Sequence, residues 1–250
     1  MTNKNMFSVK NKVVIVTGSS QGNGFAIAKG FIENGAYVCG IDIKKPNNSV
    51  VTKSKKFLYI SCDLSCDDSV LEAIKKIKNN YKKIDVVINN AGISKPLAHG
   101  DKKFYDWDLT HKINLRAPFF LISHLTSLMK KGGSIINVTS LGSVLGFPDN
   151  PSYVSSKGGL KMLTKSLAVD LGKKGIRVNN LLPGYMKTAM TKKSFMNKDL
   201  KEERDKRIIM NRWGNPADLI GPCIFLASDS SSYITGSDIL VDGGWTAKGL

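Results

Sequence analysis

The feature that most constrains the fold is a repeated alternation of short apolar runs with amphipathic segments. Seven apolar runs are predicted as strands, at residues 13–16, 36–43, 57–62, 86–88, 134–138, 177–182 and 239–241. Runs that are apolar on both faces are typical of strands buried in a parallel sheet. Residues 23–34 and 69–81 carry apolar side chains at helical spacing, and Gly35 is expected to end the first helix. The pattern predicts an α/β fold, with a doubly wound parallel sheet of about seven strands and helices on both faces.

One segment departs from this alternation. Residues 188–215 are polar and rich in Lys and Met, so we interpret them as a small helical lid over a substrate, here called the lid segment. No linker, low-complexity stretch or repeat divides the chain. We therefore expect residues 1–250 to form a single domain.

The composition is that of an ordinary soluble globular protein, with 42% hydrophobic and 23% charged residues. No apolar run approaches the roughly 20 residues that span a bilayer, and the first twelve residues lack the apolar core of a secretion signal. We expect a cytoplasmic protein with no membrane partner. Four scattered cysteines do not suit a disulfide framework. No Cys or His pair completes a zinc site beside Cys62 and Cys66, so no metal is expected.

The formal net charge of +17 could attract an acidic substrate, a phosphate-rich cofactor or nucleic acid. The basic residues are mostly Lys and are spread along the chain, without an Arg-rich run or a basic patch interleaved with aromatic residues. That distribution is typical of a solvated surface, and no nucleic-acid partner is expected.

A glycine-rich loop follows the first predicted strand, with the sequence Thr17-Gly18-Ser19-Ser20-Gln21-Gly22-Asn23-Gly24. Glycines let the chain turn sharply and let its main chain approach a pyrophosphate, and the following helix N-terminus supplies unpaired N–H groups. Three nearby glycines alone could also be an ordinary strand-to-helix turn. Their place between a β-branched strand and an amphipathic helix favours a dinucleotide site.

Asp42 ends the second predicted strand, 18 residues beyond Gly24. A carboxylate there can accept hydrogen bonds from adenosine ribose hydroxyls and would repel a 2′-phosphate. Gln21 stands where a phosphate-binding Arg or Lys could be. Both residues favour NAD over NADP, although Lys44 and Lys45 follow closely and keep the preference from being absolute.

The most informative stretch runs from Ser140, after the fifth predicted strand, to Tyr153 and Lys157. The last two residues are four apart, which places them on one helix face. A phenol with an ordinary pKa near 10 acts near neutral pH only if its phenolate is stabilised, as a nearby ammonium does. Tyr153 could then exchange a proton with an alcohol while hydride moves to or from the nicotinamide, with Ser140 holding the substrate oxygen.

With these motifs assembled, the chain resembles the short-chain dehydrogenase/reductase family over nearly its whole length. The matching pieces are the loop at 17–24, Asp63-Leu64, Asn89-Asn90-Ala91-Gly92, Asn114, Ser140, Tyr153, Lys157, Asn179, Pro183-Gly184 and Thr188. The resemblance implies a Rossmann-type fold and an NAD(P)-dependent oxidoreductase acting on CH–OH groups. One departure is Asn23, where the family commonly has Ile; its main-chain N–H would still serve the pyrophosphate.

The resemblance also implies roles for individual residues. Asn114 would hold a water that links Lys157 to solvent, which completes a catalytic set of Asn114, Ser140, Tyr153 and Lys157. The full set of expected cofactor contacts comprises Gly18, Ser20, Gln21, Gly22, Asn23, Gly24, Asp42, Asp63, Leu64, Asn90, Ala91, Gly92, Tyr153, Lys157, Pro183, Gly184, Met186 and Thr188. Among these, Asp63 and Leu64 would contact the adenine, and Asn90 would contact the adenosine ribose through its main chain. Asn89 would be structural, and the group after the sixth strand would line the nicotinamide amide and pyrophosphate.

The C-terminal part resembles the branch of sugar-acid, gluconate and polyol dehydrogenases and 3-oxoacyl-carrier-protein reductases, which implies a homotetramer. Basic residues in and beside the lid segment favour a sugar, sugar acid, polyol or small hydroxy acid as substrate: Lys187, Lys192, Lys193, Arg207 and Arg212. Interleaved acidic residues leave open that these charges are only solvated. A carrier-protein reductase using NADPH is an alternative that Asp42 disfavours. A non-catalytic nucleotide-binding subunit is another, disfavoured by the intact catalytic set.

Overall fold

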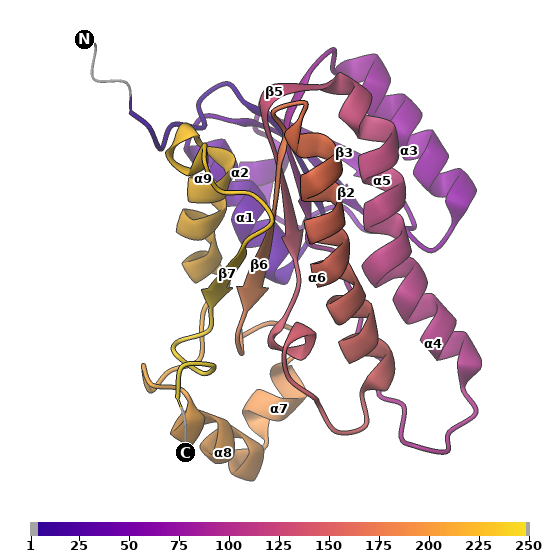
Figure 1. The fold of residues 1–250 in the computed structure, drawn as a ribbon, viewed down its shortest axis with the longest axis vertical. Coiled ribbons are helices and arrows are strands. Elements are labelled where there is room, and N and C mark those ends of the chain that lie inside the picture. The colour runs from indigo at the N-terminus through magenta and orange to yellow at the C-terminus, as the bar shows by residue number, and fades with distance from the viewer. Residues whose placement is uncertain (1–4, 249–250) are drawn as a thin grey trace.

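Seven parallel strands form one sheet in the order β3-β2-β1-β4-β5-β6-β7, in a computed structural model that describes residues 5–248 (Figure 1). This confirms the predicted α/β fold. The strands are β1 Val13–Thr17, β2 Tyr37–Asp42, β3 Phe57–Ser61, β4 Ile84–Asn89, β5 Met129–Val138, β6 Arg177–Pro183 and β7 Asp238–Val241. The α-helices are α1 Gly22–Glu33, α2 Ser49–Thr52, α3 Asp67–Asn80, α4 Phe104–His111, α5 Ala117–Leu125, α6 Pro151–Gly172, α7 Lys192–Met196, α8 Lys198–Arg207 and α9 Ile220–Ala227.

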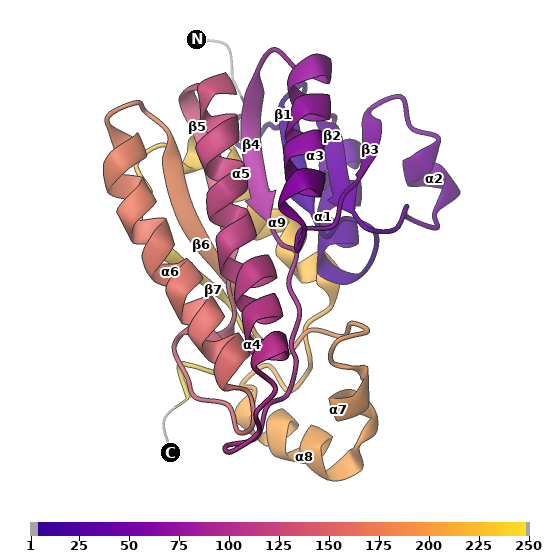
Figure 2. The ribbon, with the colours of Figure 1, turned by 90° about the vertical axis from the view of Figure 1, so that its right-hand side faces the viewer.

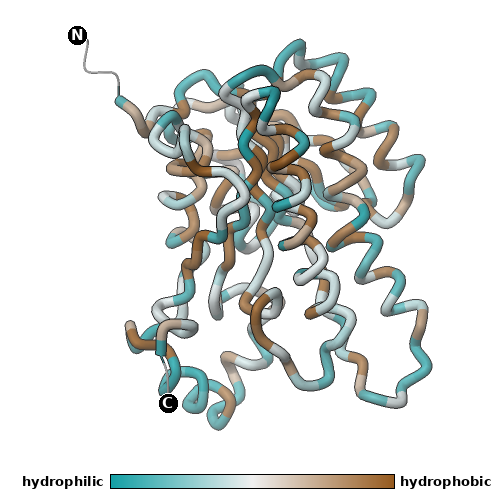
Figure 3. Tube along the Cα trace, in the orientation of Figure 1, coloured by the Kyte–Doolittle hydropathy of each residue, from teal (hydrophilic) through white to brown (hydrophobic). Residues whose placement is uncertain are grey.

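Helices cover both faces of the sheet because each strand sends alternate side chains to opposite sides. Ile15 of β1 belongs to the core beneath α3, α5 and α6, whereas Val14 and Val16 belong to the core beneath α1 and α9. Figures 1 and 2 show these two helical layers on either side of the strands. Figure 3 shows hydrophobic residues concentrated where the layers meet.

The predicted elements match the observed ones to within one or two residues at most ends, and β5 is the exception. It begins at Met129, not at residue 134. Its register against β4 shifts between the pairs Ile84–Met129 and Val86–Ser134, so the extra residues form a bulge. That stretch contains two lysines and two glycines, which carry no strand periodicity in the sequence. Gly35 lies at φ +85° directly after the C-cap of α1, as predicted.

The direction in which strands are added to the sheet reverses between β1 and β4. The connections from β1 lead outward to β2 and β3, while those from β4 lead outward to β5, β6 and β7. The loops that leave the carboxyl ends of β1 and β4 therefore diverge and open a crevice, the position at which open α/β sheets bind ligands. The glycine loop and Asn90 both lie at this crevice.

A chain of buried polar side chains ties α6 to the sheet. Asn89 Nδ2 donates to Asn137 Oδ1 (2.8 Å), and Asn137 Nδ2 donates to Thr164 Oγ1 (2.8 Å). Thr164 Oγ1 also donates to Asn180 Oδ1 (2.6 Å), whose Nδ2 donates to Asp238 Oδ1 (2.8 Å). This chain crosses β4, β5, α6, β6 and β7, and it fixes the rotation of the helix that carries Tyr153 and Lys157.

The lid segment contains α7 and α8, which lie beyond the carboxyl ends of β6 and β7 (Figure 1). A short parallel bridge pairs Met186 with Gly214, so the chain leaves and returns at one place. Lys187 N–H donates to Gly214 O (2.8 Å), and Gly214 N–H donates to Tyr185 O (2.9 Å). Within residues 5–248, no helix has the length and apolar character needed to cross a membrane.

We expect Thr164→Val to lower the free energy of unfolding by about 2–3 kcal/mol, because it leaves buried amide groups of Asn137 and Asn180 without their partner. Chemical denaturation measures this change. Ser166→Ala, at an exposed position on the same helix, is the control and should change stability by less than about 0.5 kcal/mol. Equal stability of the two variants would show that the polar chain does not hold α6.

Candidate functional site

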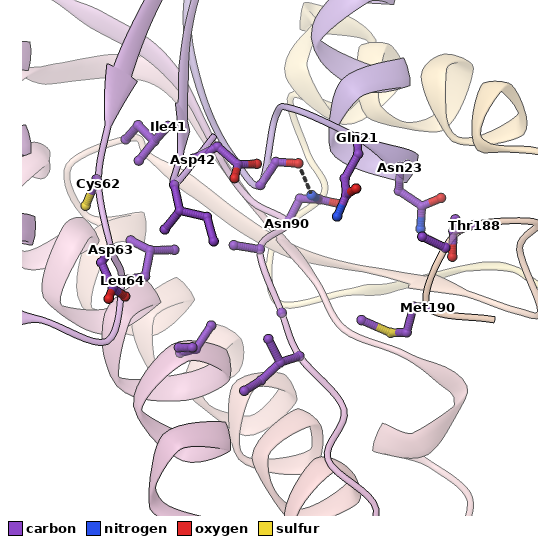
Figure 4. Close-up of a pocket in the computed structure, with 18 residues that line it drawn as sticks. Gln21, Asn23, Ile41, Asp42, Cys62, Asp63, Leu64, Asn90, Thr188 and Met190 are labelled. Atoms are coloured by element: carbon purple, nitrogen blue, oxygen red, sulfur yellow. Dashed lines mark hydrogen bonds between the residues drawn. The ribbon is translucent and has the colours of Figure 1, made fainter. Parts of the chain in front are cut away.

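A cleft of about 300 Å³ lies along the carboxyl edge of the sheet, beside the crevice between β1 and β4. Figure 4 shows side chains from four strand ends and from the segment after β6 lining it. The predicted cofactor residues that line it are Gly18, Gln21, Gly22, Asn23, Asp42, Asp63, Leu64, Asn90, Ala91, Gly92 and Thr188. The structure thus brings together residues that are up to 170 positions apart in the sequence.

The glycines of the loop have different structural tasks. Gly18 lies at φ +66°, and a Cβ on it would come within 2.9 Å of both Ala91 Cα and Asn90 Nδ2. Gly24 does not line the cleft; a Cβ there would overlap the Gly18 carbonyl oxygen. Gly22 begins α1, and the preceding Gln21 makes no side-chain cap bond. The first N–H groups of α1 therefore remain free to bind an anion at the cleft.

Asn90 and Thr17 hold the glycine loop against the end of β4. Asn90 Nδ2 donates to Thr17 O (3.0 Å) and to Gly18 O (3.3 Å). Thr17 Oγ1 in turn accepts the main-chain N–H groups of Asn90 and Ala91, both at 3.0 Å. The Asn90 side chain is thus occupied by the loop. Nothing in the sequence indicated this role for Thr17, although Thr17 is the first residue of the glycine-rich loop.

Asp42 lies at the carboxyl end of β2 with its side chain at the cleft (Figure 4). Its Oδ2 accepts the Ser20 N–H (3.0 Å), and its Oδ1 accepts the Lys44 N–H (3.3 Å). Each carboxylate oxygen can accept a further bond. Ser20 itself does not line the cleft, because its main chain is engaged with Asp42 and its hydroxyl with the Lys44 carbonyl oxygen.

A second pocket of about 110 Å³ continues the cleft toward α6. The two share a common wall made of Asn23, Asn90, Gly92, Thr188 and Met190. The second pocket, here called the reaction pocket, is also lined by Ser140, Tyr153, Lys157, Pro183, Gly184 and Met186. All predicted residues at the chemical end except Asn114 therefore face one pocket that adjoins the cleft.

Tyr153 lies beside Ser140 at the floor of the reaction pocket. Burial raises the pKa of the Tyr153 phenol, a hydrogen bond with the Ser140 side chain lowers it, and nearby Tyr185 raises it; the net shift is upward. Burial dominates because the charged phenolate loses hydration. The Ser140 hydroxyl also accepts the Gly142 N–H (3.1 Å), which orients it.

Lys157 is only 3% exposed, and its Nζ donates to Val138 O at 2.8 Å. Nζ lies 6.0 Å from the centroid of the Tyr153 ring. Burial lowers the pKa of Lys157 from its ordinary 10.5 to about 8, since no carboxylate offsets the lost hydration. The ammonium is thus held next to the phenol in a setting of low polarity, where its charge acts strongly.

Asn114 is fully buried in a five-residue π-helical stretch, Lys112–Arg116, that joins α4 to α5. Its Oδ1 accepts the Ile93 N–H (2.9 Å), and its Nδ2 donates to Ile93 O (2.9 Å) and Ser156 Oγ (3.0 Å). A Cβ on Gly92 would lie 3.3 Å from both Asn114 Oδ1 and Lys157 Nζ, so the two side chains lie close together. Both donors of the Asn114 amide are therefore used within the protein, and its Oδ1 can accept one further bond.

These residues fit a dinucleotide on three independent observations. Gly18 and Gly24 have no room for a Cβ, α1 presents an uncapped N-terminus, and Asn23 Oδ1 is buried without a partner in the described structure. Among residues 5–248, no group of three or more His, Cys, Asp or Glu side chains is placed to hold a metal ion. The sequence did not indicate Ile93, Met190 or Ser156. Ile93 and Met190 are apolar residues that line the cleft, and Ser156 acts only through its hydrogen bond with Asn114, so none of them belongs to a recognisable motif.

Comparison with known proteins supports this geometry. A family model described as enoyl-(acyl-carrier-protein) reductase matches residues 18–246. The 2-dehydro-3-deoxy-D-gluconate 5-dehydrogenase of Dickeya dadantii is 34% identical, over 98% of this chain and 99% of its own. The 3-oxoacyl-(acyl-carrier-protein) reductase of Thermotoga maritima is 35% identical, over 94% and 98%. The chain belongs to the short-chain dehydrogenase/reductase family. It is an NAD(P)-dependent oxidoreductase acting on CH–OH groups, as predicted.

Solved structures of this family superpose closely on the chain. A gluconate 5-dehydrogenase from Beutenbergia cavernae, described as putative and NAD(P)-dependent and carrying NADP at low occupancy, has a TM-score of 0.92 at 30% identity. It covers 98% of this chain and 100% of its own. A 4-hydroxyisoleucine dehydrogenase complexed with NADH has a TM-score of 0.90 at 31% identity, over 96% and 100%. A Burkholderia cenocepacia gluconate 5-dehydrogenase with NADP and tartrate has a TM-score of 0.90 at 28% identity, over 98% and 99%.

The buried Lys157 makes stability depend on pH in a defined direction. Its folded pKa of about 8 lies below its ordinary 10.5, so the folded protein binds fewer protons between these values and stability rises with pH there. Lys157→Met removes this dependence. We expect the variant's stability relative to the parent to fall by about 3 kcal/mol between pH 7 and pH 10.5. Denaturant unfolding at several pH values measures the difference in unfolding free energy between variant and parent. Ionisations that both proteins share cancel in this difference. A difference that does not change with pH would contradict the burial of the ammonium.

Proposed function

We propose that Tyr153 exchanges the proton of a secondary alcohol while hydride passes between the substrate carbon and NAD. The observation that carries this proposal is the meeting of Ser140, Tyr153 and Lys157 in a pocket that adjoins the cleft and shares lining residues with it. When bound, the cofactor supplies the hydride acceptor at its nicotinamide ring. Ser140 holds the substrate oxygen, the phenolate of Tyr153 takes its proton during oxidation, and the phenol returns it during reduction.

Lys157 stabilises the phenolate through its charge, and Asn114 would hold the water that links Lys157 to solvent. Without that charge little phenolate would form near neutral pH, because burial raises the pKa of the Tyr153 phenol. The other predicted contacts keep their assignments as part of this proposal: Asp63 and Leu64 lie at the adenine end of the cleft, and Pro183, Gly184 and Met186 lie at the nicotinamide end.

We propose that NAD is the preferred cofactor. Asp42 places a carboxylate at the end of β2, where it would repel a 2′-phosphate, and the loop carries Gln21 in place of a cation. The similar solved structures include complexes with NADP and one with NADH, so both cofactors occur in the family. The carboxylate is the local feature on which the preference depends.

We propose a sugar acid or related hydroxy acid as the substrate. Similar proteins are gluconate and 2-dehydro-3-deoxygluconate dehydrogenases, and one structure holds tartrate. Among the described residues that line the reaction pocket there is no Asp or Glu, and Lys157 is the single basic one, which favours an anion. Arg212 is not available for this purpose, because its guanidinium pairs with both carboxylate oxygens of Asp218 (2.7 and 3.1 Å).

A 3-oxoacyl-(acyl-carrier-protein) reductase is the second candidate, supported by the relative from Thermotoga maritima. It differs in substrate and cofactor, because it would reduce the 3-oxo group of a carrier-bound acyl chain with NADPH. Asp42 disfavours that cofactor.

We further propose that the lid segment covers the substrate and that the protein is a cytoplasmic homotetramer. Thr188, Met190 and Thr191 contribute to the wall of the reaction pocket. Large apolar side chains are exposed on α5, α6 and β7, namely Phe119, Met162, Val169 and Leu240, and such surface is typical of contacts between subunits. Three of the four free cysteines are buried, in line with a reducing compartment.

Tyr153→Phe should lower turnover by at least 10³-fold, because it removes the proton-transfer group while leaving the ring in place. NAD binding should stay within about twofold. The measurement is NAD-linked oxidation in a screen that pairs gluconate with uncharged sorbitol and includes hydroxy acids, alongside NAD titration. Tyr105→Phe, at an exposed position, is the control. A Tyr153→Phe enzyme that turned over normally would disprove the assignment of the proton donor.

Asp42→Ala should shift the ratio of kcat/KM for NAD over NADP toward NADP by about 10- to 100-fold. The physical reason is that it removes a charged hydrogen-bond acceptor, worth about 1.5–3 kcal/mol, and a charge that repels the 2′-phosphate. Initial rates with both cofactors measure the ratio. Asp68→Ala makes the same change in net charge at an exposed position on α3 and should leave the ratio unchanged. The preference for NAD would be refuted if the parent used NADP more efficiently.

A further inference from the structure

The side chain of Asn23 contains a polar atom that the fold leaves unsatisfied. Asn23 is the second residue of α1, and its Oδ1 is buried without a hydrogen-bond donor among the described residues. A buried acceptor that has lost water and gained no donor destabilises a folded protein, so such an atom needs an explanation, above all where it lines a cleft. The position of Asn23 therefore calls for a ligand that carries a donor.

Asn23 lies at the junction of the two spaces. It lines the cofactor cleft and also the reaction pocket that contains Ser140 and Tyr153. Figure 4 shows the amide nitrogen of Asn23 on the side of Thr188 and the amide oxygen directed away from it. The Thr188 main-chain N–H donates to Thr191 Oγ1 (3.1 Å), and the two threonine hydroxyls pair with each other (3.3 Å). Thr188 therefore closes the opposite wall without satisfying Asn23.

The part of a dinucleotide that reaches this junction follows from the proposed function, on which this inference rests. Asp42 marks the adenosine end, and the uncapped start of α1 suits the pyrophosphate. Hydride transfer requires the nicotinamide to lie against the pocket of Tyr153. Asn23 then falls beside the nicotinamide, whose carboxamide carries an NH2 group with two donors.

We propose that Asn23 Oδ1 accepts a hydrogen bond from the carboxamide NH2 of the nicotinamide, which makes Asn23 a specificity-determining residue for the cofactor. The pyrophosphate of a dinucleotide is ionised near neutral pH and has acceptors but no donor, so it does not suit this oxygen. A bond here fixes the rotation of the carboxamide and thereby the orientation of the ring relative to Tyr153. An aliphatic residue at this position could pack against the ring but could not select for the NH2 group.

The experiment compares the parent with Asn23→Leu, which has similar volume and no acceptor, using calorimetric dissociation constants without substrate. Four probes are titrated. NAD and thionicotinamide adenine dinucleotide both carry the NH2 group. In 3-acetylpyridine adenine dinucleotide a methyl group replaces the NH2 group, and ADP-ribose lacks the nicotinamide ring. The measured quantity is the ratio of the dissociation constant of the acetylpyridine analogue to that of each NH2-bearing dinucleotide. We expect this ratio to be about fivefold larger in the parent than in the variant. ADP-ribose should bind both proteins equally, which also shows that the variant is folded.

Asn79→Leu, at an exposed position on α3, is the matched control and should behave as the parent. Equal weakening of all four probes in Asn23→Leu would overturn the inference, because Asn23 would then shape only the phosphate loop. Undiminished discrimination in the variant would also overturn it, and a change in the substrate KM, measured separately by steady-state kinetics, would then indicate a substrate contact. If the parent bound neither NAD nor ADP-ribose, the proposed function itself would be refuted.

Discussion

The site depends on the close approach of the loops that follow β1 and β4. Gly18 has no room for a Cβ against Ala91, and the Asn90 amide reaches through this contact to the carbonyl groups of Thr17 and Gly18. Since β1 and β4 are neighbours at the point where the sheet order reverses, this contact forms the floor of the cleft. It directs the N-terminus of α1 into the cleft. The cofactor end of the site is therefore a consequence of main-chain packing as much as of polar side chains.

The chemical end depends on the orientation of α6. Lys157 and Thr164 are seven residues apart, so they lie on one face of the helix. Thr164 connects that face to Asn137 of β5 and Asn180 of β6. With the helix held in this rotation, Lys157 points at the end of β5 and donates to Val138. Burial of the ammonium costs stability, a cost that proteins commonly carry at functional sites.

Some parts of the site could be predicted because they depend on local spacing. Tyr153 and Lys157 are one helical turn apart, and the glycine loop follows a β-branched strand directly. Other parts involve contacts between distant segments and left no local signal. The occupied amide of Asn114, the packing task of Gly24 and the pairing of Arg212 with Asp218 belong to this second group.

The sequence by itself determined the α/β class, the order of elements and the family, because hydrophobic periodicity and motif spacing are properties of the chain read in order. It did not determine where β5 begins, since the residues from Met129 to Gly133 acquire strand structure only by pairing with β4 through a bulge. Nor did it determine what Asn23 does. Only the folded chain places that amide oxygen at the junction of the cleft and the reaction pocket, without a donor among residues 5–248. Whether a polar atom is satisfied depends on its neighbours in space, and those are decided by tertiary packing.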